Sequence, residues 1–251
     1  MQEVKLRLFV SFARWFCVHP SGTEHLIRLW ACVLALATSV AHADENSLTA
    51  YYRGEINSGN NDRLFESLQS RKIRQLIIDS PGGDVIAGIA LGRWVSQNGI
   101  DVVVENQCLS SCANYVFPAG RRKIIRRNAI VAWHGNYHHL QATGLWVDDI
   151  VSRMARTGED RDEARVKVKQ QMQDLVRRER EFFSAIGVDQ RLCWVGKMPP
   201  YSSPDYFTMS ADDMRRYGVH SLITEGNPLI TQSKKFEVDV RWISLERRAP
   251  R

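Results

Sequence analysis

The chain of 251 residues contains no repeat period and no low-complexity stretch, and its apolar runs are short. These absences exclude a solenoid, a fibrous protein and a disordered polar chain. A composition of 44% hydrophobic and 25% charged residues is ordinary for a globular protein. A single domain of about 200 residues can bury its own core without help from metals or disulfides.

The N-terminal segment, residues 1–43, does not fit that globular pattern. Basic residues precede an apolar run, Leu26 to Val40, which ends in Ala41-His42-Ala43. The uninterrupted part, Trp30 to Ala37, is too short to cross a hydrocarbon layer about 30 Å thick. The segment therefore predicts a secretory signal peptide, with cleavage after Ala43 and export of the mature protein. The alternative is an uncleaved anchor, in which case the protein meets a membrane only through this segment.

Neither sign of charge dominates, because the chain has 34 basic and 28 acidic residues. The most charged stretch, Arg153 to Arg180, mixes both signs. A solvated helix face explains such a stretch better than a nucleic-acid surface, so we expect no nucleic-acid partner.

Cysteine is scarce as well, and only Cys108, Cys112 and Cys193 follow the expected cleavage site. In an oxidising compartment Cys108 and Cys112 could pair, since residues four apart on a helix have Cα atoms within disulfide range. Such a bridge would close a very short loop and add little stability. It would bracket Ser110.

Strands and helices alternate along the rest of the chain. Apolar runs and helical spacing predict strands at 51–56, 73–79, 101–105, 123–125, 129–133 and 221–224, and helices at 62–70, 85–98, 113–117 and 209–218. A loop at 135–144 leads to one long helix. This order predicts an α/β fold with a mainly parallel sheet and right-handed crossovers. We expect one domain over residues 44–225 and a polar C-terminal extension over 226–251.

The turn Ser80-Pro81-Gly82-Gly83 directly follows a predicted strand and directly precedes a predicted helix. Glycines there allow a positive φ and leave backbone N–H groups exposed at the positive end of a helix dipole. The turn could bind a phosphate or stabilise an oxyanion. A plain strand-to-helix turn is the alternative.

Two further residues carry the side chains of a nucleophilic site. Ser110 stands at a strand-to-helix elbow, where a hydroxyl can project from the carboxyl edge of the sheet, and Ser111 offers its N–H toward the same point. His134 ends the next strand and could act as base for a serine. The alternatives are a helix N-cap for Ser110 and a structural histidine for His134. A metal site built on His134 and His138 lacks further ligands, so we expect no metal.

The order of these elements resembles the proteolytic subunit of Clp protease and its crotonase-fold relatives, with their ββα superhelix. Three stretches carry the resemblance, namely Ile77 to Gly83, Gln107 to Ala113 and Ile130 to His134. A Tyr217-Gly218-Val219 turn adds weaker support. With its signal peptide, the chain looks similar to exported, periplasmic Clp-like proteins of Gram-negative bacteria.

The resemblance implies a serine hydrolase that acts on peptides or proteins, assembles as a homo-oligomer and needs no cofactor. Ser110 would attack a carbonyl and His134 would take its proton. The amides of Gly83 and Ser111 would form the oxyanion hole.

The match fails at the acid of the triad, because the family's position falls on Tyr206. Asp205 is one residue away and is our prediction, while Asp148, Asp149 and Asp189 are other candidates. Three alternatives remain open: an inactive Clp-like binding or scaffold protein of the cell envelope, acyl-CoA chemistry of the crotonase kind, and a Ser-Lys dyad using Lys123 or Lys167.

Overall fold

The central strands form where the apolar runs are densest. The computed structural model describes residues 48–69, 71–144, 147–158, 160–226 and 238–245. All of them belong to one compact unit, residues 46–251. The expected signal peptide, residues 1–43, lies outside the described residues.

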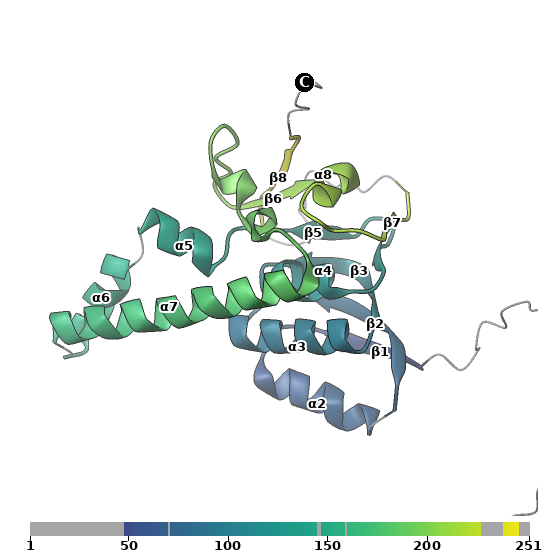
Figure 1. Ribbon diagram of the computed structural model, residues 1–251, viewed down its shortest axis with the longest axis horizontal. Helices are drawn as coiled ribbons and strands as arrows, with labels where there is room; N and C mark the ends of the chain where they lie inside the picture. Colours follow the sequence, from purple (N-terminus) through teal and green to yellow (C-terminus); the bar gives the residue numbers. More distant parts are fainter. Residues whose placement is uncertain (1–47, 70, 145–146, 159, 227–237, 246–251) are drawn as a thin grey trace, which may run out of the picture. The chain divides into compact units, whose positions relative to one another are not determined.

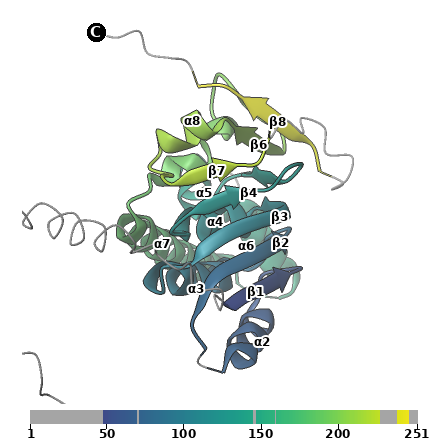
Figure 2. The same ribbon diagram turned by 90° about the vertical axis from the view of Figure 1, so that its right-hand side faces the viewer.

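A parallel sheet has the strand order β1-β2-β3-β4-β7 (Figure 2). Strand β5 pairs with β3 alone. The strands of this sheet are β1 (Leu48–Arg53), β2 (Ile73–Ser80), β3 (Asp101–Leu109), β4 (Lys123–Ile125), β5 (Ile130–Ala132) and β7 (Leu222–Thr224). A second parallel pair joins β6 (Tyr206–Met209) to β8 (Val240–Ile243). The predicted α/β class with a mainly parallel sheet is therefore confirmed.

Helices connect these strands. They are α2 (Ser58–Leu68), α3 (Val85–Gln97), the π-helical turn η1 (Cys112–Val116), α4 (Phe117–Ala119), α5 (Tyr137–Thr143), α6 (Val147–Arg156), α7 (Arg161–Ile186), the 3-10 turns η2 (Gln190–Cys193) and η3 (Val195–Lys197), and α8 (Ala211–Arg215). Within the described part of the chain, none of these helices is both long and apolar enough to span a membrane.

Strand β3 is longer than the sequence pattern predicts. We expected a polar elbow from Asn106, but the strand continues to Leu109 because its second half has a partner of its own. Gln107, Cys108 and Leu109 pair with β5, whereas the first half of β3 pairs with β4. The two ladders share one edge of β3, so the ends of β3 and β5 lie side by side.

Helix α5 lies where the sequence pattern predicted a loop. Asn136 caps its first turn by accepting a hydrogen bond from the amide of His139, and Gly144 ends it with φ 65°. These are ordinary helix-start and helix-end residues. Polar residues and the absence of an apolar stripe concealed the helix.

The segment 226–251 is more than a polar extension. Its described part contains β8, and Val240, Ile243 and Leu245 are buried. Val240 and Ile243 are three positions apart and so lie on opposite faces of the strand, where they join two different apolar clusters. The packed chain therefore reaches at least Leu245.

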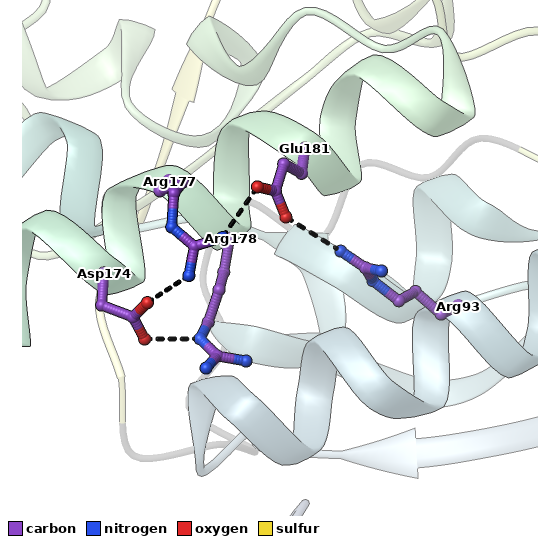
Figure 3. Close-up of polar contacts among 5 residues, drawn as sticks. All are labelled: Arg93, Asp174, Arg177, Arg178 and Glu181. Atoms are coloured by element: carbon purple, nitrogen blue, oxygen red, sulfur yellow. Dashed lines mark hydrogen bonds and ion pairs between the residues drawn. The ribbon is translucent and has the colours of Figure 1, made fainter.

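Helix α7 extends past the sheet, and α6 lies beside its first turns (Figure 1). We call α6 together with residues 161–176 of α7 the helical arm. A small separate core of Val151, Ala164 and Val168 holds the arm together. Where α7 reaches α3, exposed ion pairs link Glu181 to Arg93 and Arg177, and Asp174 to Arg177 and Arg178 (Figure 3).

Candidate active site

The turn after β2 touches the elbow after β3. Gly82 has φ 94°, and a Cβ built on it would lie 2.6 Å from the carbonyl oxygen of Leu109 and 2.7 Å from Cβ of Ser110. Only glycine fits this contact, since real Cβ atoms do not approach other atoms so closely. Ile56 fixes the turn from the other side, because its amide donates to the Gly82 carbonyl over 2.7 Å.

Ser110 occupies a left-handed backbone conformation with φ 52°. Such a φ is uncommon in residues other than glycine and often marks a functional position. The Ser110 amide donates to the Ala132 carbonyl over 3.2 Å, and the Ser110 carbonyl accepts from the Asn114 amide over 2.8 Å. The elbow is thus hydrogen-bonded to β5 on one side and to η1 on the other.

Further contacts clamp the elbow. Cys108 and Cys112 form a disulfide, with their Cα atoms 5.1 Å apart. The Ser111 hydroxyl donates to the Gly83 carbonyl over 2.7 Å, which ties the elbow to the glycine turn. Ser110 therefore lies between two constraints that come from different parts of the chain.

His134 follows β5 and lies against Ser110. The Oγ atom of Ser110 is 2.7 Å from Nε2 of His134, within hydrogen-bonding distance. Burial lowers the pKa of His134, and the charge of Lys197 acts in the same direction, whereas Asp205 acts against both. The imidazole is therefore neutral at pH 7 and can accept the serine proton.

Gly83 and Ser111 line the same cavity as Ser110. This cavity has a volume of about 200 Å³ and is also lined by Val85, Tyr137 and Leu140. Neither amide donates a hydrogen bond within the described part of the chain. Two free N–H groups beside a nucleophilic oxygen are what an oxyanion hole requires.

The structure does not bring Asp205 to the imidazole. No carboxylate among the described residues hydrogen-bonds to His134. Lys197 donates to the backbone carbonyl of Asp205 over 3.0 Å. The neighbouring Tyr206 instead packs on the His134 ring, with ring centroids 4.6 Å apart.

The other candidate acids whose contacts are described serve elsewhere. Asp148 pairs with Arg165 in the helical arm, and Asp189 pairs with Arg191 beside η2. His138 and His139 belong to α5 and stack on Trp194. Within the described ranges, no group of histidine, cysteine or acidic side chains could hold a metal ion.

Glu179 is a site-supporting residue that the sequence reasoning missed. It is fully buried, and its carboxylate accepts hydrogen bonds from the Tyr115 hydroxyl and from the amides of Tyr137 and His138. Burial raises the pKa of Glu179, while the Tyr115 hydrogen bond and the two amides act against burial. The carboxylate thus anchors the first turn of α5, which forms one wall of the cavity.

A signal for Glu179 exists in the sequence. Val168, Met172, Val176 and Phe183 recur at helical spacing along the buried side of α7, and Glu179 falls within that stripe. An acidic residue in an apolar stripe indicates a buried carboxylate that needs donors nearby. Asn114 had no comparable signal, although its side chain donates to the Gly135 carbonyl and so supports the backbone next to His134.

Comparisons with known proteins give a distant likeness. No family model matches the sequence, and no curated protein matches it. Among solved structures, a point mutant of ClpP1 from Listeria monocytogenes is similar with a TM-score of 0.42 and 15% identity, over 71% of this chain and 92% of that chain. ClpP1 from Listeria monocytogenes itself gives a TM-score of 0.37 with the same identity and coverage. At this identity the likeness is one of fold alone.

Proposed function

We propose that the chain is a serine hydrolase in which Ser110 is the nucleophile and His134 the general base. The observation that carries the proposal is the 2.7 Å contact between Ser110 Oγ and His134 Nε2 at an elbow with φ 52°. An ordinary helix N-cap does not need a left-handed backbone or a histidine on its hydroxyl. A serine poised for attack needs both an exposed position and a base.

The reaction follows from the geometry. Ser110 Oγ attacks the carbonyl carbon of a bound acyl group as its proton passes to His134 Nε2. The tetrahedral oxyanion accepts hydrogen bonds from the amides of Gly83 and Ser111. His134 then protonates the leaving amine, and an acyl-serine remains. Water attacks this ester, His134 takes the proton of the water, and collapse releases the carboxylic acid and restores Ser110.

Peptides are the proposed substrate class, as the resemblance of the three motifs implies. Export to an oxidising compartment is part of the proposal. The Cys108–Cys112 disulfide supports export, because such bonds persist outside the reducing cytosol.

Labelling of the purified protein with a fluorophosphonate probe tests the proposal. We expect covalent labelling of the wild type and none of Ser110→Ala. Ser111→Ala is the matched control, because it removes the adjacent hydroxyl and keeps the backbone amide. It should still be labelled, although more slowly, since the hydrogen bond to the Gly83 carbonyl is lost. An unlabelled wild type, or equal labelling of Ser110→Ala, would reject the proposal.

The pH dependence of labelling tests the role of His134. A protonated imidazole cannot accept the serine proton, so the rate should be lost as pH falls through the pKa of His134. Burial lowers this pKa below its ordinary value of 6.5. We therefore expect half of the maximal rate at a pH below 6.5. A half-maximal pH above 6.5 would contradict the assignment.

A peptide-binding module without turnover is the second candidate, and one observation favours it. Among the described residues no carboxylate hydrogen-bonds to His134, and loss of the triad acid can lower the rate about 10⁴-fold. An unlabelled wild type that still binds peptides, with affinity unchanged by Ser110→Ala, would establish this candidate instead.

A further inference from the structure

Backbone pairing decides which side chain meets His134. The amide of Trp133 donates to the carbonyl of Phe207 over 2.9 Å, and the amide of Phe207 donates to the carbonyl of Trp133 over 2.8 Å. This is a hydrogen-bonded antiparallel pair. In that register residue 134 stands opposite residue 206, and their side chains share a face.

The same register does not include Asp205. Asp205 precedes β6 (Tyr206–Met209), and no hydrogen bond links its carboxylate to His134 among the described residues. The charge of Asp205 still acts on His134, where it opposes the lowering of the pKa. The acid expected from the resemblance is thus displaced by one position, and an aromatic residue stands in its place.

Tyr206 packs on the base of the proposed site. Its ring lies on the imidazole of His134 at a centroid distance of 4.6 Å and an interplanar angle of 33°. Burial raises the pKa of Tyr206, with the charge of Asp205 acting in the same direction, so the hydroxyl keeps its proton at neutral pH.

The stacked ring restricts the imidazole. With Tyr206 packed on one face of His134, the ring of the histidine cannot tilt toward that side. Limiting the orientation of the imidazole is a task that a carboxylate on Nδ1 performs in a Ser-His-Asp triad.

We propose that Tyr206 is the third member of the site and holds the His134 ring in position by stacking on it. This inference rests on the proposed function and specifies how the site works without a triad acid. Phenylalanine at this position keeps the ring, whereas leucine removes it.

The test compares rates of fluorophosphonate labelling in wild type, Tyr206→Phe and Tyr206→Leu. We expect Tyr206→Phe to retain most of the wild-type rate, because the ring that packs on the imidazole remains. We expect a fall of roughly 100-fold for Tyr206→Leu, because the base is no longer held in place. Tyr201→Leu is the matched control, since Tyr201 donates its hydroxyl to the Ser244 carbonyl and takes no part in the site; its rate should not change.

A second readout separates positioning from general damage. Proton NMR titration reports the pKa of His134 with or without turnover. Removal of the ring exposes the imidazole, so Tyr206→Leu should raise this pKa toward 6.5, whereas Tyr206→Phe should leave it unchanged. Lys197 and Asp205, the charges that act on His134, are the same in all variants.

The outcomes distinguish the two proposals. An unlabelled wild type rejects the proposed hydrolase, and the NMR titration then still decides whether Tyr206 covers His134. A labelled wild type together with a Tyr206→Leu variant that has the wild-type rate and the wild-type His134 pKa overturns the role of Tyr206. Tyr206→Met, which fills similar space without a ring, replaces Tyr206→Leu if the latter does not fold.

Discussion

The elbow around Ser110 and the helical arm are held together in different ways. At the elbow, partners lie far apart in sequence: the Ser110 amide bonds to Ala132, the Ser111 hydroxyl bonds to Gly83, and Gly82 touches Ser110. In the arm, a small apolar cluster joins neighbouring helices. Many of the ion pairs on α7 are exposed and join residues three or four apart.

The contacts at the elbow fix the geometry of the site, whereas those in the arm affect only the stability of its helices. Contacts between distant segments determine where the Ser110 oxygen lies relative to His134, and a misplacement of about 1 Å can cost a reaction roughly 100-fold. Exposed pairs within a helix contribute little. Changes at the elbow should therefore alter the chemistry, and equivalent changes in the arm should not.

The largest expected effect compares two glycines with nearly the same backbone. Gly82 has φ 94° and Gly158, at the turn between α6 and α7, has φ 95°. A Cβ on Gly82 meets Leu109 and Ser110, while one on Gly158 meets no atom within 4 Å. Gly82→Ala should lower the free energy of unfolding by about 3 kcal/mol or more and slow labelling by roughly 100-fold.

In the matched variant Gly158→Ala only the positive φ is unfavourable for alanine. The free energy of unfolding should therefore fall by about 1 kcal/mol, and labelling should not change. Denaturant unfolding and labelling per folded molecule measure both quantities. Equal labelling rates of the two variants would contradict the conclusion that the elbow controls the chemistry and the arm does not.

An intermediate effect is expected from the disulfide. Replacing Cys108 and Cys112 together by alanine removes a link between residues separated by only four positions. The unfolded chain gains little freedom, so the free energy of unfolding should fall by about 2 kcal/mol or less. Labelling should slow by roughly tenfold, because Ser110 is no longer clamped in its left-handed conformation.

Reduction of the wild type should reproduce this slower rate, and the same reductant should leave the double variant unchanged. A double variant that is labelled as fast as wild type would show that hydrogen bonds alone hold the elbow.

The smallest effect is expected at the ion pairs of Figure 3. Glu181→Gln removes the charge that Arg93 and Arg177 face. These side chains are half exposed, so the thermal midpoint should move by at most about 1 °C and labelling should stay the same. A larger shift in the midpoint, measured by circular dichroism, would show that α3 and α7 depend on their surface charges.

The sequence predicted the parts of the molecule that depend on neighbours along the chain. Apolar runs identified the central strands, and the turn at Gly82 and Gly83 gave the first element of the site. The extension of β3 to Leu109 could not be predicted, since it depends on pairing with β5.

The contact of Tyr206 with His134 could not be predicted for the same reason. It depends on the pairing of Trp133 with Phe207, two residues that lie far apart in sequence. Ser110 and His134 themselves were predicted from motif order, and the structure brings them into contact.

The pairing of Trp133 with Phe207 has a consequence for the time at which the site forms during synthesis. The ribosome releases Ser110 early, followed by His134, while Tyr206 and the strand that holds it emerge only after all of α7. Domains fold as units as their chain becomes available. The arrangement around His134 is therefore completed only when β6, which follows α7 along the chain, pairs beside the end of β5.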